Sequence, residues 1–357
     1  MDLNNLILFF ILISFSLFFY KYFVVFLNKY NPKLLVDDQF KKPQSFHETP
    51  ISISGGTGIF FSFLILNLYL FLSKEIVYYE YLSFCSLFFI LGLSDDLKLD
   101  LRPKFRLLAM LIILIGLVIS NNFYVENTGI EFLNRFLEID IFALFFICLC
   151  FLFIINGSNL IDGYNGLLSI HTLIILINLS FVNYLNENND LAFFILCLIL
   201  ILITFLKYNF PKASIFLGDG GSYFLGAFIA ISVINTSIAN PEISPFYFCI
   251  LLFYLFFEVF FSFIRKISKE RMSPLFPDKK HLHMLIYKNF IKRNNNKLKS
   301  NYLTSLVLNA FYLILILPGI FMMNDGMFCK YYAVGLLIIY VFCYRMILNN
   351  LIKLNVL

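Results

Sequence analysis

Apolar runs long enough to cross a bilayer recur along almost the whole chain, and they constrain its fold more than any other feature. A membrane-spanning helix needs about 20 predominantly apolar residues. Hydrophobic residues make up 60% of the 357 residues and charged residues only 14%, whereas soluble domains are about 45–50% apolar and about 25% charged. A water-soluble fold could not bury this much Phe, Leu and Ile. The sequence therefore predicts an all-α polytopic membrane protein.

About eleven segments are candidate transmembrane helices, and a count of ten is also acceptable because several are short or polar at one end. They lie near residues 3–27, 56–73, 77–94, 105–120, 140–155, 164–182, 190–206, 221–238, 245–264, 302–323 and 329–348. The segments between them are too short for a separate soluble domain, and no internal repeat is visible. We therefore expect residues 1–357 to form a single membrane-embedded domain.

Basic residues are distributed unequally between the two sets of connecting loops. If the N-terminus lies outside, the inside loops and their helix ends hold about 23 of the 27 lysine and arginine residues, as the positive-inside rule requires. This topology predicts that four polar motifs share the inside face. We expect that face to be the cytoplasmic side of a bacterial inner membrane, and to carry the active site.

The first motif is a pair of adjacent carboxylates, Asp95 and Asp96, that ends the apolar run 77–94. Like charges at a helix C-terminus repel each other and the negative end of the helix dipole, so a bound divalent cation or a proton would make the pair favourable. The alternative is a solvated acidic loop. Basic residues in the following segment, 98–106, could neutralise either the pair or a bound phosphate.

The second motif, Asn159-Leu-Ile-Asp162-Gly-Tyr-Asn165, separates two apolar runs. Its three polar residues recur at helical spacing, so in a helical turn they would share one side. Polar side chains at membrane depth are tolerated where they line a cavity or satisfy one another. A polar helix–helix contact is the alternative to a binding site.

The third motif places Asp219 in a glycine-rich turn, shortly after Phe216 and just before the apolar run 221–238. An aspartate at the start of a helix is typical of a place where a magnesium-bridged phosphate binds. It is equally typical of a simple helix cap. The residues alone leave both interpretations open.

The fourth motif is the pair His281 and His283 in a basic loop. Alternate positions place both rings on one side of an extended segment, where they suit phosphate or sugar hydrogen bonding. An exposed surface pair is the alternative, and a zinc site fits less well because no cysteine lies near. Within the apolar runs, Glu258 is a functional candidate as an intramembrane acid, and His171 is expected to hydrogen-bond between helices.

Taken together and in this order, the motifs resemble the polyprenyl-phosphate N-acetylhexosamine-1-phosphate transferase family. The resemblance covers about residues 43–287: the loop 43–58 with its Gly-Gly pair, GLSDD, NGSNLIDGYNGL, FLGDGGSYFLG and PDKKHLHMLIY. Asn165 stands where many bacterial members have aspartate, Ile53 where a basic residue is common, and the histidines are HxH rather than a triple. These departures are compatible with activity, and they favour an N-acetylhexosamine over the cell-wall pentapeptide substrate.

The resemblance implies transfer of an N-acetylhexosamine-1-phosphate from a UDP-sugar donor to polyprenyl (undecaprenyl) phosphate, with release of UMP. This would be the first membrane step of an O-antigen-like polysaccharide or a cell-wall polymer. The implied cofactor is Mg²⁺, with Mn²⁺ as an alternative. The implied partners are the two substrates, membrane lipids and a second copy in a homodimer, with no nucleic acid.

The resemblance also implies roles for individual residues. Asp219 and Asn159 would be the metal ligands with Asp162 beside them, Asp95 would be the base or the anchor for the lipid phosphate, and Asp96 would hold the basic residues and the metal environment in place. Uracil would contact Asn165 and Phe216. The groups that would face phosphate or sugar are Lys104, Lys207, His281 and His283.

Two other functions are compatible with a polytopic membrane fold. A secondary transporter would place ionisable residues near mid-membrane on broken helices, in repeated halves, whereas here the acids gather at one face and no repeat is visible. An inactive scaffold of the same fold is the second alternative. The retention of all the acids of the first three motifs argues against it.

Overall fold

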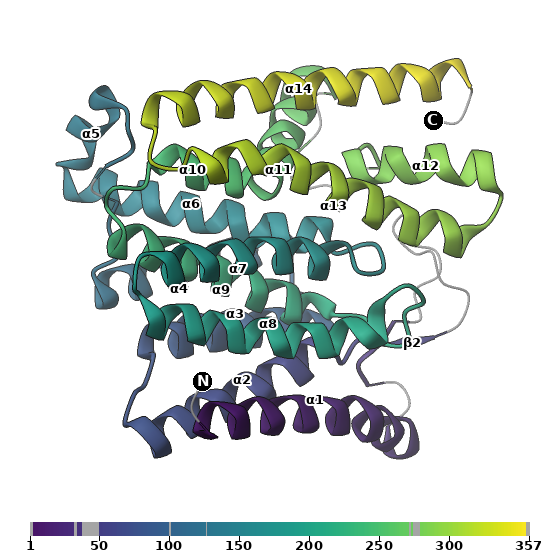
Figure 1. Cartoon of the computed structure of the whole chain (residues 1–357). Coiled ribbons are helices and arrows are strands. Elements are labelled where there is room, and N and C mark those ends of the chain that lie inside the picture. Colours follow the sequence, from purple (N-terminus) through teal and green to yellow (C-terminus); the bar gives the residue numbers. More distant parts are fainter. Residues whose placement is uncertain are drawn as a thin grey trace.

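The structure is a computed structural model that describes residues 3–31, 34–37, 50–99, 101–125, 127–270, 273 and 279–354. Within these ranges it consists almost entirely of helices that lie side by side (Figure 1). The helices are α1 (Leu3–Tyr30), α2 (Gly55–Lys74), α3 (Tyr79–Asp96), α4 (Pro103–Asn121), α5 (Glu131–Leu137), α6 (Asp140–Ile161), α7 (Leu167–Leu185), α8 (Asn189–Asn209), α9 (Gly218–Ala239), α10 (Pro245–Leu251), α11 (Phe253–Arg265), α12 (Leu282–Asn294), α13 (Lys297–Phe321) and α14 (Gly326–Lys353). A π-helical turn, Lys266–Glu270, follows α11, and the short strands β1 (Val36–Asp37) and β2 (Ile51–Ser52) pair antiparallel.

The prediction of an all-α polytopic membrane protein is confirmed. In the part of the chain that the structure describes, nine helices are long and apolar enough to cross a membrane, and the bent pair α10–α11 makes a tenth. The nine are α1, α2, α4, α6, α7, α8, α9, α13 and α14. The eleventh expected segment is α3, which has 18 residues and carries three acids, Glu80, Asp95 and Asp96.

The prediction of one helix over residues 245–264 is wrong. α10 and α11 meet at an angle of 75°, and Leu252 between them has φ −95° and ψ 4°, which is the bridge region rather than the helical one. The break releases a carbonyl, and the Tyr312 hydroxyl of α13 donates a hydrogen bond to that of Leu251. A contact from a distant helix therefore satisfies the backbone where the span bends.

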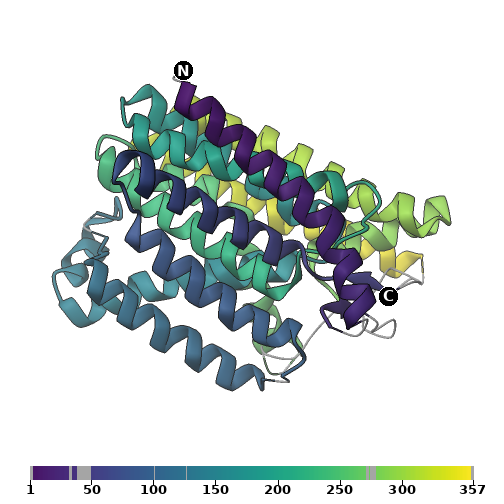
Figure 2. The ribbon, with the colours of Figure 1, turned by 90° about the horizontal axis from the view of Figure 1, so that it is seen from below.

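Helix α9 forms the centre of the bundle and packs against α2, α3, α6 and α7. Small residues allow this packing: a Cβ atom on Gly56 would lie 2.4 Å from the Gly221 Cα atom, and one on Gly226 would lie 2.7 Å from the Ile155 Cα atom. Figure 2 shows α1 and α2 covering one side of these inner helices. The close packing fixes the N-terminus of α9 relative to the ends of its neighbours.

Candidate active site

The two carboxylate oxygens of Asp96 hold the N-terminus of α9. Oδ1 accepts a hydrogen bond from the Asp219 backbone N–H at 2.8 Å, and Oδ2 accepts one from the Gly220 N–H at 2.9 Å. The chain enters α9 through Gly218, whose φ of +82° suits glycine. A carboxylate at this position satisfies N–H groups that have no partner within their own helix. Asp96 thus ties the end of α3 to the start of α9.

Asp95, the neighbouring acid, points to a different helix. Its Oδ2 atom accepts a hydrogen bond from Nη1 of Arg106 in α4 at 2.7 Å, and its side chain is only 12% exposed. Successive residues of an α-helix point about 100° apart, so one acid faces α9 and the next faces α4. The structure therefore places the basic side chain of Arg106 against Asp95, and the role that the resemblance implies for Asp96 stays a prediction.

Asn159, in the last turn of α6, reaches the same place. Its Nδ2 atom donates to Oδ1 of Asp219 at 2.7 Å and lies 3.0 Å from the Ser222 hydroxyl oxygen. Asp162 follows directly after α6, close to Asp219 and Asp96. Burial, and then the negative charges of these two neighbours, raise the pKa of the Asp162 carboxyl well above its ordinary range. The first three motifs thus converge where α3, α6 and α9 meet.

The hydrogen bonds of Asn165 go to residues outside this group of acids. Helix α6 ends at Ile161, so the expected helical spacing does not continue to Asn165. Its backbone N–H donates to Oδ1 of Asn301 at 2.8 Å, and its side-chain amide donates to the Pro211 carbonyl at 2.9 Å. The turn is held further by a hydrogen bond of 2.7 Å from the Gly166 N–H to the Asn209 side chain.

The two histidines are buried, so the interpretation as an exposed surface pair is wrong. His281 precedes α12 and is 3% exposed, and His283 lies in its first turn and is 0% exposed. Their rings are parallel to within 4°, with centroids 5.5 Å apart, so they do share one side. The ring of His283 also lies 5.7 Å from that of Tyr164, which connects the histidine pair to the second motif.

The other predicted residues lie around this centre. Phe216 is half-buried, and its backbone bonds Ser52 and Gly55 at 2.8 Å and 2.9 Å. Residues 43–49, which begin the motif loop 43–58, lie outside the described part of the chain. Lys104 and Lys207 are exposed, in the first turn of α4 and the last turn of α8. The structure does not bring these two lysines into contact with the acids.

Some contacts of the site are made by residues for which the sequence analysis predicts no role in the site. The Ser222 hydroxyl accepts a hydrogen bond from Asn159. The side chains of Asn209 and Asn301 accept hydrogen bonds from the backbone of the turn at Asn165. Asn209 and Asn301 lie at ends of α8 and α13, and both are buried. A polar residue where an apolar run meets an inside loop would be the sequence signal for such a role.

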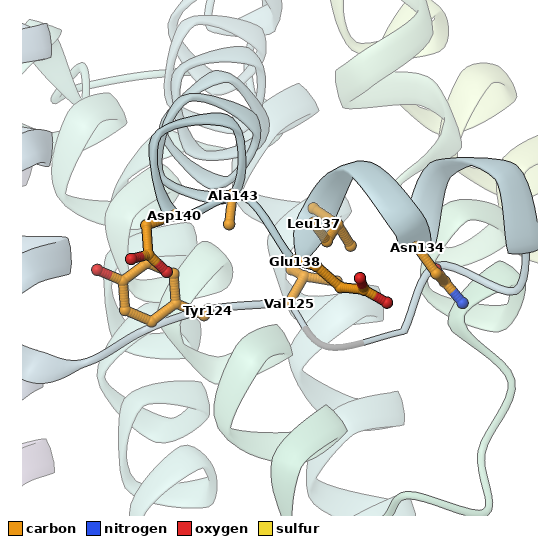
Figure 3. A pocket seen from close by; sticks show the side chains of 7 residues that line it. All are labelled: Tyr124, Val125, Asn134, Leu137, Glu138, Asp140 and Ala143. Atoms are coloured by element: carbon orange, nitrogen blue, oxygen red, sulfur yellow. The ribbon is translucent and has the colours of Figure 1, made fainter.

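A hollow of about 400 Å³ lies at the other end of α6 (Figure 3). Its lining residues come from the segment between α4 and α6 and from the start of α6: Tyr124, Val125, Asn134, Leu137, Glu138, Asp140 and Ala143. Asp140 is the first residue of α6, whereas Asn159 lies near its last. A helix of 22 residues is about 33 Å long, so this hollow is separate from the converging motifs.

The fold and the site define a class of protein: a multi-pass membrane protein in which acids and an asparagine from three helix ends meet at one end of the bundle. Residues 78–237 match glycosyl transferase family 4. The chain is 32% identical over 286 residues to the phospho-N-acetylmuramoyl-pentapeptide-transferase of Dictyoglomus turgidum, an alignment that covers 76% of this chain and 88% of the relative. The protein belongs to glycosyl transferase family 4, which confirms the resemblance found in its motifs.

Two further relatives are similar over shorter stretches. The undecaprenyl-phosphate alpha-N-acetylglucosaminyl 1-phosphate transferase of Thermotoga maritima is 30% identical over 201 residues, which is 55% of this chain and 57% of the relative. A phospho-N-acetylmuramoyl-pentapeptide-transferase of Streptococcus mutans is 34% identical over 144 residues, 39% of this chain and 42% of the relative. The chain thus spans about half the length of these two relatives. Their names describe the transfer of different groups, N-acetylglucosaminyl 1-phosphate in the first and phospho-N-acetylmuramoyl-pentapeptide in the second, so similarity alone does not select the donor.

Proposed function

We propose that this protein transfers an N-acetylhexosamine-1-phosphate from a UDP-sugar to polyprenyl phosphate, such as undecaprenyl phosphate, and releases UMP. The observation that carries the proposal is the convergence of Asp96, Asn159 and Asp219, which joins α3, α6 and α9 through hydrogen bonds of 2.7–2.9 Å. Asp95 and Asp162 lie beside them. The names of the relatives describe reactions of this class.

In the proposed reaction an oxygen of the lipid phosphate attacks the β-phosphorus of the UDP-sugar. The bond from that phosphorus to the bridging oxygen breaks, and UMP leaves with the bond's electron pair. Both reactants are anions, so catalysis consists mainly of positioning and charge neutralisation. In this proposal Asp95, which Arg106 contacts at 2.7 Å, is the base or the anchor for the lipid phosphate, and the Arg106 guanidinium supplies positive charge beside it.

The oxygen atoms of this site fit Mg²⁺, which prefers oxygen ligands and keeps several of its waters. Asp219 and Asn159 would hold the ion with Asp162 beside them; when bound, Mg²⁺ neutralises diphosphate charge. In the described part of the chain, no three His, Cys, Asp or Glu side chains are grouped as a complete metal site. The ion would therefore take part of its coordination from the amide, the substrate phosphates and water.

Mg²⁺ is expected to stabilise the protein, and Asp162→Asn is expected to weaken that effect. At a concentration 100-fold above its Kd the ion adds about 2.7 kcal/mol to the free energy of unfolding. The variant loses one of three mutually repelling carboxylates, so its melting temperature without Mg²⁺ rises while its response to Mg²⁺ falls. Thermal unfolding in detergent across a Mg²⁺ titration measures both.

The matched control for this titration is Asp140→Asn, because Asp140 is exposed at the opposite end of α6. It should respond to Mg²⁺ as the original protein does. Equal responses from all three proteins would show that Asp162 does not contribute to binding the ion. Mn²⁺ in a parallel titration compares the two metals.

We further infer that the site faces the cytoplasm across a bacterial inner membrane. The supporting observation is that the basic loops and the converging acids lie at the same ends of the helices, as the positive-inside rule requires for a cytoplasmic face. A basic inner surface also attracts anionic lipids and the donor, by about 1 kcal/mol per charge near the surface. Cysteine labelling from either side of spheroplasts, at Lys104→Cys and at Glu131→Cys, would test this orientation.

The proposed activity predicts UMP release that requires undecaprenyl phosphate, a divalent cation and one UDP-sugar from a panel. The panel contains UDP-N-acetylhexosamines and UDP-MurNAc-pentapeptide, since relatives of both kinds exist. We expect an N-acetylhexosamine to be the substrate and EDTA to stop the reaction. Turnover of the pentapeptide donor alone would overturn the assignment of the sugar. Silence from folded protein, with an active relative run alongside, would overturn the transferase assignment itself.

A further inference from the structure

Glu258 is buried in the middle of α11, where an unpartnered carboxylate would be very unfavourable. It is 1% exposed. Oε1 lies 3.0 Å from Nδ1 of His281 and accepts a hydrogen bond of 3.2 Å from the Leu282 backbone N–H. Oε2 accepts one of 2.6 Å from the Tyr340 hydroxyl. A single carboxylate thus connects α11, the start of α12 and α14.

Helix α14 holds the histidine segment at a second point. The Tyr344 hydroxyl donates to the Lys280 carbonyl at 2.9 Å, one residue before His281. The ring of Tyr340 packs against Phe257 and Phe261 of α11, with centroids 4.9 Å and 5.3 Å apart. α14 follows the motif-bearing region, and residues 78–237 of the family match do not include it. Its contacts nevertheless fix the backbone and the side chain of a predicted binding residue.

A carboxylate on one nitrogen of an imidazole determines both the orientation of the ring and the tautomer at the opposite nitrogen. Glu258 contacts Nδ1, so the Nε2 edge of the His281 ring points away from α11. His283 has a similar arrangement, because its Nδ1 atom lies 3.2 Å from the Tyr254 hydroxyl of the same helix. The two rings lie parallel, with centroids 5.5 Å apart.

We propose that Glu258, held by Tyr340 of α14, is a positioning residue that presents the Nε2 edge of His281 to the phosphate or sugar of the donor. This inference rests on the proposed function and adds to it a buried acid and the last helix of the chain. The alternative is that His281 and Tyr340 serve only to make a buried carboxylate tolerable. The two differ in whether the effect of Glu258 on the reaction passes through His281.

A double-mutant cycle with Glu258→Gln and His281→Asn tests this coupling. We expect Glu258→Gln to lower kcat/KM for the UDP-sugar by about 10- to 100-fold, as loss of an orienting carboxylate does elsewhere. The loss should lie mainly in the KM of the donor, with the KM of polyprenyl phosphate unchanged. Added to His281→Asn, the same change should cost almost nothing further. Multiplicative losses would show that Glu258 is merely structural.

Tyr340→Phe keeps the ring packing and removes one hydrogen bond from Glu258. We expect kcat/KM for the donor to fall about threefold to tenfold, in line with a hydrogen bond of ordinary strength. Tyr331→Phe is the matched control, because Tyr331 is 69% exposed on the same helix. Equal activities of the two variants would overturn the role of α14, and this pair remains informative if Glu258→Gln does not fold.

Nitrogen NMR of ¹⁵N-histidine-labelled protein tests the positioning without any turnover. The chain has only four histidines, and His281→Asn identifies one set of signals. We expect Nδ1 of His281 to carry a proton in the original protein and the tautomers to mix in Glu258→Gln. An unchanged spectrum would overturn the proposal. An inactive protein with the expected spectra would instead count against the proposed function alone.

Discussion

Asp219→Asn is expected to lower the rate of UMP release by about 10²- to 10³-fold, the cost of losing one contribution to the stabilisation of transition-state charge, because Asp219 would hold the Mg²⁺ that neutralises this charge. The substitution keeps the shape of the side chain, including an oxygen that can accept the hydrogen bond from Asn159. It also leaves the backbone N–H of residue 219, which Asp96 caps, in place. What it removes is the negative charge at the point where α3, α6 and α9 converge.

The rate is to be measured at saturating donor and lipid, with thermal unfolding as the check on folding. Asp140→Asn makes the same chemical change at the far end of α6 and should retain full activity. An Asp219→Asn protein that melts normally and works within tenfold of the original rate would leave Asp219 with a structural role only. The reaction would then have to be placed elsewhere in the bundle.

The general architecture could be predicted from sequence because bilayer thickness fixes the length of an apolar helix. The convergence of motifs could be predicted too, since loop charges sort helix ends between two faces. The bend between α10 and α11 could not be predicted from the sequence. Residues 246–264 contain no glycine or proline, and the released carbonyl is satisfied by Tyr312, which follows some 60 residues later.

The sequence also could not predict which residues contact one another within the site. Asp95 and Asp96 are chemically identical neighbours, and only the positions of α4 and α9 decide that the first meets Arg106 and the second caps a helix. The burial of the histidine pair depends likewise on α14, whose apolar sequence resembles any other lipid-facing helix. Local spacing in the sequence indicates which polar residues have a role in the site, whereas tertiary packing decides which of them contact one another.

The close contact between α3 and α9 predicts that Gly92→Ala is strongly destabilising. A Cβ atom on Gly92 would lie 2.3 Å from the Asp219 carbonyl oxygen, which belongs to the backbone and cannot rotate away. Forcing extra volume into a packed core costs about 1–3 kcal/mol. The helices would have to separate at the residues that Asp96 joins, so UMP release should fall together with the melting temperature.

Gly116→Ala is the matched control, because a Cβ atom on Gly116 of α4 would have no heavy atom within 4 Å. Alanine is favoured over glycine inside a helix by about 1 kcal/mol, so this variant should melt at the original temperature or slightly above it and keep its activity. The two substitutions are chemically identical, and both lie in helices that pack at the edge of the site. A difference between them therefore measures the α3–α9 contact itself. If Gly92→Ala were as stable and active as Gly116→Ala, then α3 and α9 would not be in contact at the Asp219 carbonyl, and the joining of the first and third motifs would lose its structural basis.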